Sequence, residues 1–313
     1  MTQPLALGID IGGTNTSYGI VNRHGEILEK GGMPTTGHAT PDEYFIALAD
    51  ALKPLIDKFG KENINGVGIG APNGNFFTGE IVFAPNLPWH GVIPIAKTVS
   101  EALGLKATLT NDANAAAIGE MMYGAAKGMK DFILVTLGTG VGSGFVANGQ
   151  MIYGHDGFAG ELGHVIAVRD GRKCGCGRLG CLEAYASATG IVRTAHEWLE
   201  ERNTETVLRT NNGKITAKMI HDAATEGDAF ALELFDYTGK ILGQTLADMV
   251  AITSPEAIIF FGGLARSGAL LLGPVHKYME ANMLNIFQNK VALLQSALPD
   301  ADAAILGASA LAW

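Results

Sequence analysis

A strand-turn-strand pattern occurs twice in this chain and limits the folds that it can adopt. The apolar run 5–11 leads into a glycine-rich turn, and a second strand is expected at 17–21. The same layout returns later, where the apolar run 131–137 leads into the glycine-rich turn 138–144 and a return strand. Two copies of one unit predict a duplicated α/β fold of two lobes with a ligand cleft between them.

Both turns have the composition of a phosphate-binding turn, because glycines expose backbone N–H groups that can face an anion. The candidate residues of the first turn are Asp10, Gly12, Gly13, Thr14 and Asn15, and those of the second are Gly138, Thr139, Gly140 and Gly142. A glycine-rich turn taken alone is a weak signal. A plain hairpin turn is therefore the alternative for the first segment.

All three cysteines of the 313-residue chain lie in one segment. Cys174 and Cys176 are one residue apart, Cys181 follows, and His164 lies ten positions before the first cysteine. Three thiolates and one imidazole complete a tetrahedral zinc set, which leaves no open position for a catalytic water. The pattern predicts a structural zinc ion, with glycines that allow tight turns at 175, 177 and 180.

A loop with free cysteines, two of them a redox pair, is the alternative to a zinc site. A thioredoxin-type pair has two residues between its cysteines and follows a strand, and neither feature is present. Two carboxylates flank the segment, Glu161 before the histidine and Glu183 after the last cysteine. A bound metal would fix the geometry of these side chains.

Length and composition indicate a globular protein and exclude some partners. The chain of 313 residues is long enough for two lobes with substantial cores. Its net charge is −9 with no run of lysine or arginine, which argues against a nucleic-acid surface. No apolar run approaches the length of a membrane span, and the amino terminus lacks a leader pattern. We therefore expect a cytoplasmic protein without a membrane segment, in which cysteines bind metal rather than each other.

An acid stands where a strand runs into a helix. The strand expected at 106–110 delivers Asn111 and Asp112 to an alanine-rich helix that ends near Gly124. Open α/β sheets bind ligands at the carboxyl ends of their strands, so Asp112 is a candidate general base. The alternative role for this carboxylate is an N-cap. Asn86 and Trp89 are of types that line sugar pockets, with a purely structural role in their loop as the alternative.

Helical patterns complete the α/β reading. A capping box at Thr40 begins a helix that Pro54 should kink and that ends at Gly60. Further helices are expected over 182–201, 228–252, 267–284 and 303–312.

These motifs resemble the ROK family (repressors, open reading frames and sugar kinases) along the whole chain, and within it the bacterial glucokinases. The matching motifs are Asp10-Ile-Gly-Gly-Thr-Asn15, Asn111-Asp112-Ala-Asn-Ala-Ala, Leu137-Gly-Thr-Gly140-Val-Gly142, Glu161-Leu-Gly-His164 and Cys174-x-Cys176-Gly-x-x-Gly-Cys181-x-Glu183. The resemblance implies an actin-like ATPase fold of the hexokinase type, a duplicated ribonuclease H-like architecture. The lobes would comprise 1–108 with 301–313, and 109–300 with the zinc loop 160–185.

The resemblance also implies an activity, the transfer of a phosphoryl group from ATP to a hexose, with D-glucose expected, and it implies a homodimer. Asp112 would take the proton from the 6-hydroxyl of the sugar, and Asp10 would act through Mg²⁺. His164 would bind zinc through one ring nitrogen and meet the sugar with the other. The remaining hydroxyls would be held by Asn111, Glu161 and Glu183. The two glycine-rich turns would cradle the phosphates of ATP, and Gly262 and Gly263 would border its adenosine.

One departure from the family pattern and several alternatives stay open. After Gly70-Ala-Pro72 the family usually has a glycine and another proline, whereas this chain has Asn73-Gly74-Asn75. The hydroxyl-binding residue types serve any hexose, so N-acetylmannosamine, fructose, mannose or allose could replace glucose. A non-catalytic sugar-binding protein is a further alternative. A DNA-binding regulator is not expected, because the first strand begins at Leu5 and the charge is acidic.

Overall fold

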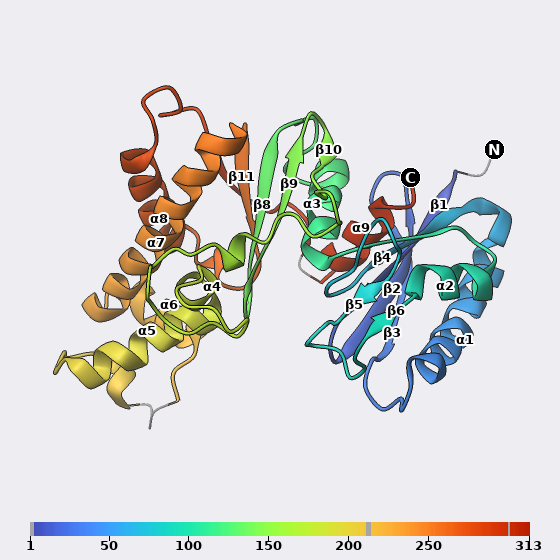
Figure 1. Ribbon diagram of the computed structural model, residues 1–313, viewed down its shortest axis with the longest axis horizontal. Coiled ribbons are helices and arrows are strands. Elements are labelled where there is room, and N and C mark those ends of the chain that lie inside the picture. The colour runs from blue at the N-terminus through green and yellow to red at the C-terminus, as the bar shows by residue number, and fades with distance from the viewer. Residues whose placement is uncertain (1–2, 211–213, 300) are drawn as a thin grey trace. The chain divides into compact units, whose positions relative to one another are not determined.

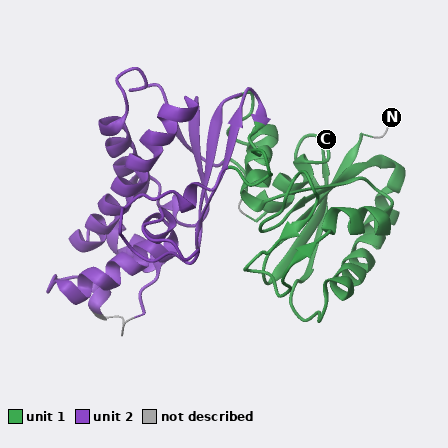
Figure 2. Ribbon diagram, in the orientation of Figure 1, with its two compact units in different colours: residues 1–129, 151–159, 297–313 green, residues 130–150, 160–296 purple. Residues whose placement is uncertain are grey.

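The computed structural model describes residues 3–210, 214–299 and 301–313 and consists of two compact units (Figures 1 and 2). Unit 1 contains the chain up to Met129, the segment Met151–Ala159 and the chain from Ala297 on. Unit 2 contains Lys130–Gln150 and Gly160–Ser296. Residue 300, at the expected lobe boundary, lies outside the described residues.

Each unit is built on one five-stranded mixed sheet, and the two sheets have the same strand order. The unit 1 order is β3-β2-β1-β4-β7, with β1 Leu5–Ile11, β2 Asn15–Asn22, β3 Ile27–Pro34, β4 Ile64–Gly70 and β7 Ala107–Thr110. The unit 2 order is β10-β9-β8-β11-β12, with β8 Phe132–Leu137, β9 Val141–Ala147, β10 Gln150–Met151, β11 Ala257–Phe261 and β12 Ala292–Gln295. The repeated sequence pattern thus corresponds to two α/β sheets of one topology.

Glycines let the last helix of unit 1 lie directly on its sheet. α9 (Ala303–Ala310) packs on β1 and β4, and a Cβ at Gly68 would come within 1.8 Å of the Ala308 carbonyl oxygen. α3 (Asp112–Tyr123) packs on α9 in turn, where Gly119 meets Gly307. This contact places α3 in unit 1, whereas the lobe boundary expected from the sequence assigned it to the other lobe.

The other helices of unit 1 enclose its core. α1 (Pro41–Phe59) and α2 (Ile95–Leu103) pack against each other, and a short hairpin joins β5 (Ile81–Val82) to β6 (Val92–Ile93). The Thr40 side chain accepts a hydrogen bond from the Glu43 N–H, as the predicted cap requires. The helix continues through Pro54 to Phe59, and Gly60 is its C-cap, as predicted.

Unit 2 carries a helical layer beside its sheet, in which α7 (Ala229–Thr253) and α8 (Ala269–Asn282) form the largest helix pair. The helix predicted over 182–201 is wrong as one element, because it is divided into α4 (Glu183–Ala186) and α5 (Ala188–Glu201). Ser187 between them is extended, and its hydroxyl accepts from the Gly190 N–H as the N-cap of α5. The sequence analysis did not identify α6 (Ala217–Thr225).

Within the described part of the chain, none of the helices is both long enough and apolar enough to cross a bilayer.

Candidate active site and metal centre

Two acids lie at one edge of the unit 1 sheet. β1, β4 and β7 run parallel, and their register aligns Asp10 with Gly70 and Gly70 with Thr110. Asp112 follows this edge as the first residue of α3. A Cβ added at Gly70 would lie 3.6 Å from Asp10 Oδ1 and 4.0 Å from the Asp112 Cα. The predicted metal-linked acid and the predicted base therefore flank the same glycine.

The surroundings of both acids raise the pKa of their carboxyl groups. Burial, with a smaller contribution from the charge of Asp112, raises the pKa of the Asp10 carboxyl to about 7. Burial also raises the pKa of the Asp112 carboxyl, and a hydrogen bond from the Ala113 N–H partly offsets this effect. Asp112 keeps an exposed surface, so crowding by protein atoms rather than full enclosure causes the shift. A divalent cation beside these oxygens would relieve their repulsion, and carboxylate oxygens are the ligands that Mg²⁺ prefers.

Asn111, rather than Asp112, is the N-cap of α3. The Asn111 Oδ1 accepts a hydrogen bond of 2.7 Å from the Asn114 N–H, while Asp112 already has a helical position. The N-cap alternative for Asp112 is therefore wrong. Because the cap uses the carbonyl oxygen of Asn111, its NH₂ group is the part suited to a sugar hydroxyl.

The first glycine-rich turn, residues 12–15, lies against Asn86. A Cβ at Gly13 would come within 2.3 Å of the Asn86 carbonyl oxygen, and the Asn86 side chain is exposed. Below the turn, the Thr16 hydroxyl hydrogen-bonds to those of Thr35 (2.8 Å) and Tyr44 (2.7 Å). This buried network holds β2 where it leaves the turn.

Trp89 belongs to the unit 1 core. Its indole is 8% exposed, packs 4.8 Å from the Tyr44 ring centroid and donates to the His38 carbonyl oxygen at 3.1 Å. Trp89 therefore has the structural role that was the alternative, and its buried ring is not available to stack against a sugar.

The second glycine-rich turn, residues 138–142, is held by Glu183. One oxygen of Glu183, Oε2, accepts from the Val141 N–H at 3.0 Å, and a Cβ at Gly140 would lie 2.2 Å from the same oxygen. The start of α5 supports the turn as well, because the Thr189 hydroxyl donates to the Thr139 carbonyl oxygen at 2.8 Å. Glu183 was expected to bind a sugar hydroxyl, and its contact with the Val141 N–H was not predicted from the sequence.

A cavity of about 350 Å³ in unit 2 lies beside Gly263, which was expected near adenosine. It is lined by Ala188, Ala217, Lys218, His221, Gly263, Leu264, Arg266 and Ser267. A neighbouring hollow of about 520 Å³ shares Ala188 and Ala217 with it and reaches Thr139. Six of these lining residues, three from α6 and three from the turn after β11, were not predicted from the sequence. The cap residue Thr216 and the spacing of Ile220, Ala223 and Ala224 could have indicated α6.

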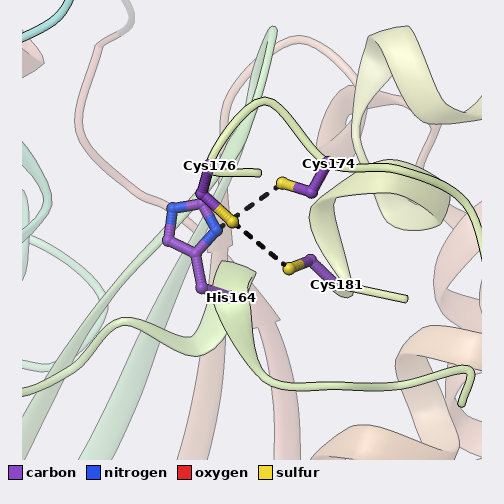
Figure 3. Close-up of side chains that lie close together, drawn as sticks. All are labelled: His164, Cys174, Cys176 and Cys181. Atoms are coloured by element: carbon purple, nitrogen blue, oxygen red, sulfur yellow. Dashed lines mark hydrogen bonds between the residues drawn. The ribbon is translucent and has the colours of Figure 1, made fainter. Parts of the chain in front are cut away.

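The four predicted zinc ligands meet in unit 2 (Figure 3). Their donor atoms all lie within 4.8 Å of one another, with Cys174 Sγ 3.8 Å from His164 Nδ1 and Cys176 Sγ 3.6 Å from Cys181 Sγ. A tetrahedron with Zn–S bonds of about 2.3 Å has edges of roughly 3.8 Å. The donor set and its spacing fit a four-coordinate zinc ion. Because His164 presents Nδ1 to Cys174 Sγ, its other ring nitrogen, Nε2, is the one left for a different partner.

A small hairpin brings the sulfurs together. Cys174 N–H donates to the Arg178 carbonyl oxygen, and the Gly177 N–H donates back to that of Cys174. Gly177 and Gly180 have φ of 88° and 81°, and a Cβ at Gly180 would lie 1.8 Å from the Val168 carbonyl oxygen. The predicted need for glycine is confirmed at these two positions. It is wrong for Gly175, where φ is not positive and a Cβ would meet nothing.

The thiols differ in acidity while they carry protons. Burial raises the pKa of the Cys181 thiol to about 12 and also raises that of Cys174. A hydrogen bond from the Arg178 backbone N–H lowers the pKa of Cys176, which is exposed. Zinc binds thiolates, so binding would release these protons.

We expect Cys176→Ser to lose bound zinc and the ordered structure of residues 160–185, because a hydroxyl is a poor zinc ligand and metal binding supplies local folding energy. Metal analysis should fall from one zinc per chain to well below one, and amide hydrogen exchange should increase in this segment. Lys173→Ser changes an exposed neighbour in the same hairpin and should leave both unchanged. Full zinc content in Cys176→Ser would contradict the assignment.

We expect Asp10→Asn to stabilise the metal-free protein increasingly as the pH rises. The folded-state pKa of about 7 exceeds the ordinary value of 3.8, so the stability that neutral Asp10 contributes is complete below about pH 4 and is lost as the pH rises through about 7. Asparagine cannot ionise, so its advantage in the free energy of unfolding should grow to roughly 4 kcal/mol at alkaline pH, because one pKa unit corresponds to about 1.4 kcal/mol.

Urea unfolding of both proteins across this pH range measures the difference. Asp57→Asn, the same change at an exposed position on α1, is the matched control. An Asp10→Asn effect that is equal at all pH values would mean that Asp10 ionises normally in the folded protein.

Comparison with known proteins identifies the family. The model of the ROK family matches residues 6–313. A glucokinase of Halalkalibacterium halodurans is 38% identical over 290 residues, which are 91% of this chain and 88% of that protein. An N-acetylmannosamine kinase of Citrobacter koseri is 32% identical and covers 98% of both chains.

A solved structure extends the match to three dimensions. The ROK family glucokinase of Streptomyces griseus, in complex with glucose and AMPPNP, is 33% identical, covers 98% of both chains and superposes with a TM-score of 0.79. Its fold agrees with that of this chain, which belongs to the ROK family.

Proposed function

We propose that this protein is an ATP-dependent hexose kinase that phosphorylates the 6-hydroxyl of D-glucose. The observation that carries the proposal is the pairing of Asp10 and Asp112 at one sheet edge, because phosphoryl transfer needs mainly charge neutralisation and one well-placed base. The similarity to glucokinases over most of the chain supports glucose as the acceptor. The duplicated sheets support an actin-like ATPase architecture.

Unit 2 has features that suit ATP. The turn 138–142 offers backbone N–H groups for phosphates, although Glu183 already engages that of Val141. Two adjoining hollows lie here, one lined by Thr139 and the other by Gly263. Lys218 and Arg266 contribute positive charge to the hollow beside Gly263. We assign the adenosine to the end near Gly262 and Gly263. In unit 1, the first glycine-rich turn, residues 12–15, is also a candidate for phosphate binding.

Asp112 would act as the general base. Its carboxylate would accept the 6-hydroxyl proton while the sugar oxygen forms a bond to the γ-phosphorus and the bond to the leaving ADP oxygen breaks. A raised pKa suits this task, because a base of higher pKa binds the proton more strongly. Asn111, Glu161, Glu183 and the Nε2 of His164 would hold the other hydroxyls, and Asn86 would border the same site.

Two metals would support these residues. Mg²⁺, held near Asp10, would neutralise the phosphate charge. Zinc, held by His164 and the three cysteines, would keep the segment 160–183 folded. The cytoplasmic location and the homodimer stay predictions from the sequence and the resemblance.

N-acetylmannosamine is the second candidate acceptor, because a kinase for this sugar is 32% identical to nearly the whole chain. A panel of glucose, N-acetylmannosamine, fructose, mannose and allose with ATP and Mg²⁺, followed by ADP release, tests both. Glucose should give the highest kcat/KM. Absence of ADP release with every sugar would leave a non-catalytic sugar-binding protein.

We expect Asp112→Asn to lower kcat by roughly 10²-fold to 10⁴-fold, the usual share of a general base, with little change in the glucose KM. The amide keeps the size of the side chain but cannot take up the proton. Steady-state kinetics of the variant, with Asp57→Asn as the matched exposed control, measure the effect. Near-normal turnover would remove Asp112 from the mechanism.

A further inference from the structure

The loop after β4, which departs from the family pattern at Asn73-Gly74-Asn75, makes a contact that the proposed reaction does not explain. Asn75 is 2% exposed. Its Oδ1 accepts from the N–H groups of Phe77 (2.9 Å) and Thr78 (3.2 Å), while its Nδ2 donates to the Asp156 carbonyl oxygen at 2.6 Å. The Oδ1 contacts fold the loop itself. The Nδ2 contact instead joins it to a segment 81 residues away.

The segment Met151–Ala159 fits this loop closely. The rings of Phe76 and Tyr153 are stacked, with centroids 4.1 Å apart and planes 7° apart. Gly157 has φ of 90°, and a Cβ there would come within 2.7 Å of both Asn75 Nδ2 and Oδ1. Only a residue without a side chain allows this approach. The contact therefore combines a buried hydrogen bond, a ring stack and a glycine.

The loop lies next to the proposed base. The Ala71 N–H donates to the Thr110 carbonyl oxygen at 3.1 Å, and a Cβ at Gly74 would lie 2.5 Å from the same oxygen. Thr110 ends β7, immediately before Asn111 and Asp112. Residues 71–75 are thus packed on the strand end that presents the base.

The segment also leads directly to a proposed sugar ligand. It is closed on itself by a hydrogen bond from the Ala159 N–H to the Tyr153 carbonyl oxygen at 3.1 Å. Two residues after Ala159 the chain reaches Glu161. Because this hydrogen bond leaves fewer backbone torsions free, fixing the segment also restricts the positions that the residues after Ala159 can take.

We propose that Asn75 is a positioning residue for the acceptor sugar. Through its amide N–H it holds the segment 151–159 against the loop that packs on the strand end before Asp112, and it thereby orders the chain leading to Glu161. This inference rests on the proposed kinase function. Under this proposal, the Asn73-Gly74-Asn75 departure from the family pattern contributes to sugar binding and does not serve only to fold its own loop. The same proposal distinguishes the two halves of one amide, since Oδ1 serves the loop and Nδ2 serves the sugar site.

Asn75→Asp tests this distinction. The carboxylate keeps an acceptor for Phe77 and Thr78 but replaces the donor with an oxygen that faces the Asp156 carbonyl. Amide exchange of 151–159 should become roughly tenfold faster, and the glucose KM should rise roughly tenfold, as expected for loss of one buried hydrogen bond. The KM for MgATP should stay unchanged and kcat should change by less than about threefold.

Asn73→Asp is the matched control in the same loop. Asn73 Nδ2 donates to the carbonyl oxygens of Val82 and Phe83, which lie outside the segment 151–159. This variant loses the same kind of donor, so it should leave the exchange of 151–159 and the glucose KM unchanged. Gly157→Ala, which pushes a methyl group against the whole Asn75 amide from the other side, should also make the exchange of 151–159 faster and raise the glucose KM.

Several results would overturn the inference. Unchanged exchange of 151–159 in Asn75→Asp would show that the contact does not hold the segment, and faster exchange with an unchanged glucose KM would remove the role in sugar binding. An equal rise in the MgATP KM would indicate general damage. If the wild-type protein phosphorylates no hexose and calorimetry detects no glucose binding, the proposed function fails and the positioning role with it, while exchange still decides the contact.

Discussion

The candidate active site depends on two carboxylates held close together by parallel-strand register. Because Asp10 pairs with Gly70 and Gly70 with Thr110, the acid on β1 and the acid after β7 cannot move apart without breaking sheet hydrogen bonds. Two partly desolvated like charges destabilise the fold. The sheet tolerates them because its other interactions offset the cost. Their repulsion would favour the binding of a cation and of a proton, both of which the proposed phosphoryl transfer would bring to this edge.

Missing side chains are as important to the arrangement as those present. Gly13 allows the Asn86 backbone to reach the first turn, Gly140 allows Glu183 to reach the second, and Gly180 allows the cysteine hairpin to fold over Val168. Each position would place a Cβ within 2.3 Å of another atom. At these positions glycine is therefore required by the close approach of other protein atoms, apart from any role in the proposed phosphate contacts.

The sequence predicted what local chemistry determines and missed what packing determines. The repeated strands and turns follow from apolar runs and glycine positions, and the ligand set follows from Cys174, Cys176, Cys181 and His164. The break at Ser187 was missed because alanine and tyrosine before it and a helical pattern after it conceal the change of direction. The place of α3 was missed because its partner α9 lies almost two hundred residues away in the sequence, and no local signal records such contacts.

Glu183 connects the metal centre of unit 2 with its phosphate turn. It lies two residues after Cys181, one of its oxygens is 3.7 Å from Cys174 Sγ, and the other accepts the Val141 N–H. A carboxylate has about four lone-pair sites, so these contacts leave capacity for a sugar hydroxyl. A zinc ion that fixes Cys181 would therefore restrict Glu183, and Glu183 would restrict the turn. If the turn 138–142 binds phosphates as proposed, an ion without an open coordination position would in this way support both substrates, because the residue next to its ligands reaches that turn.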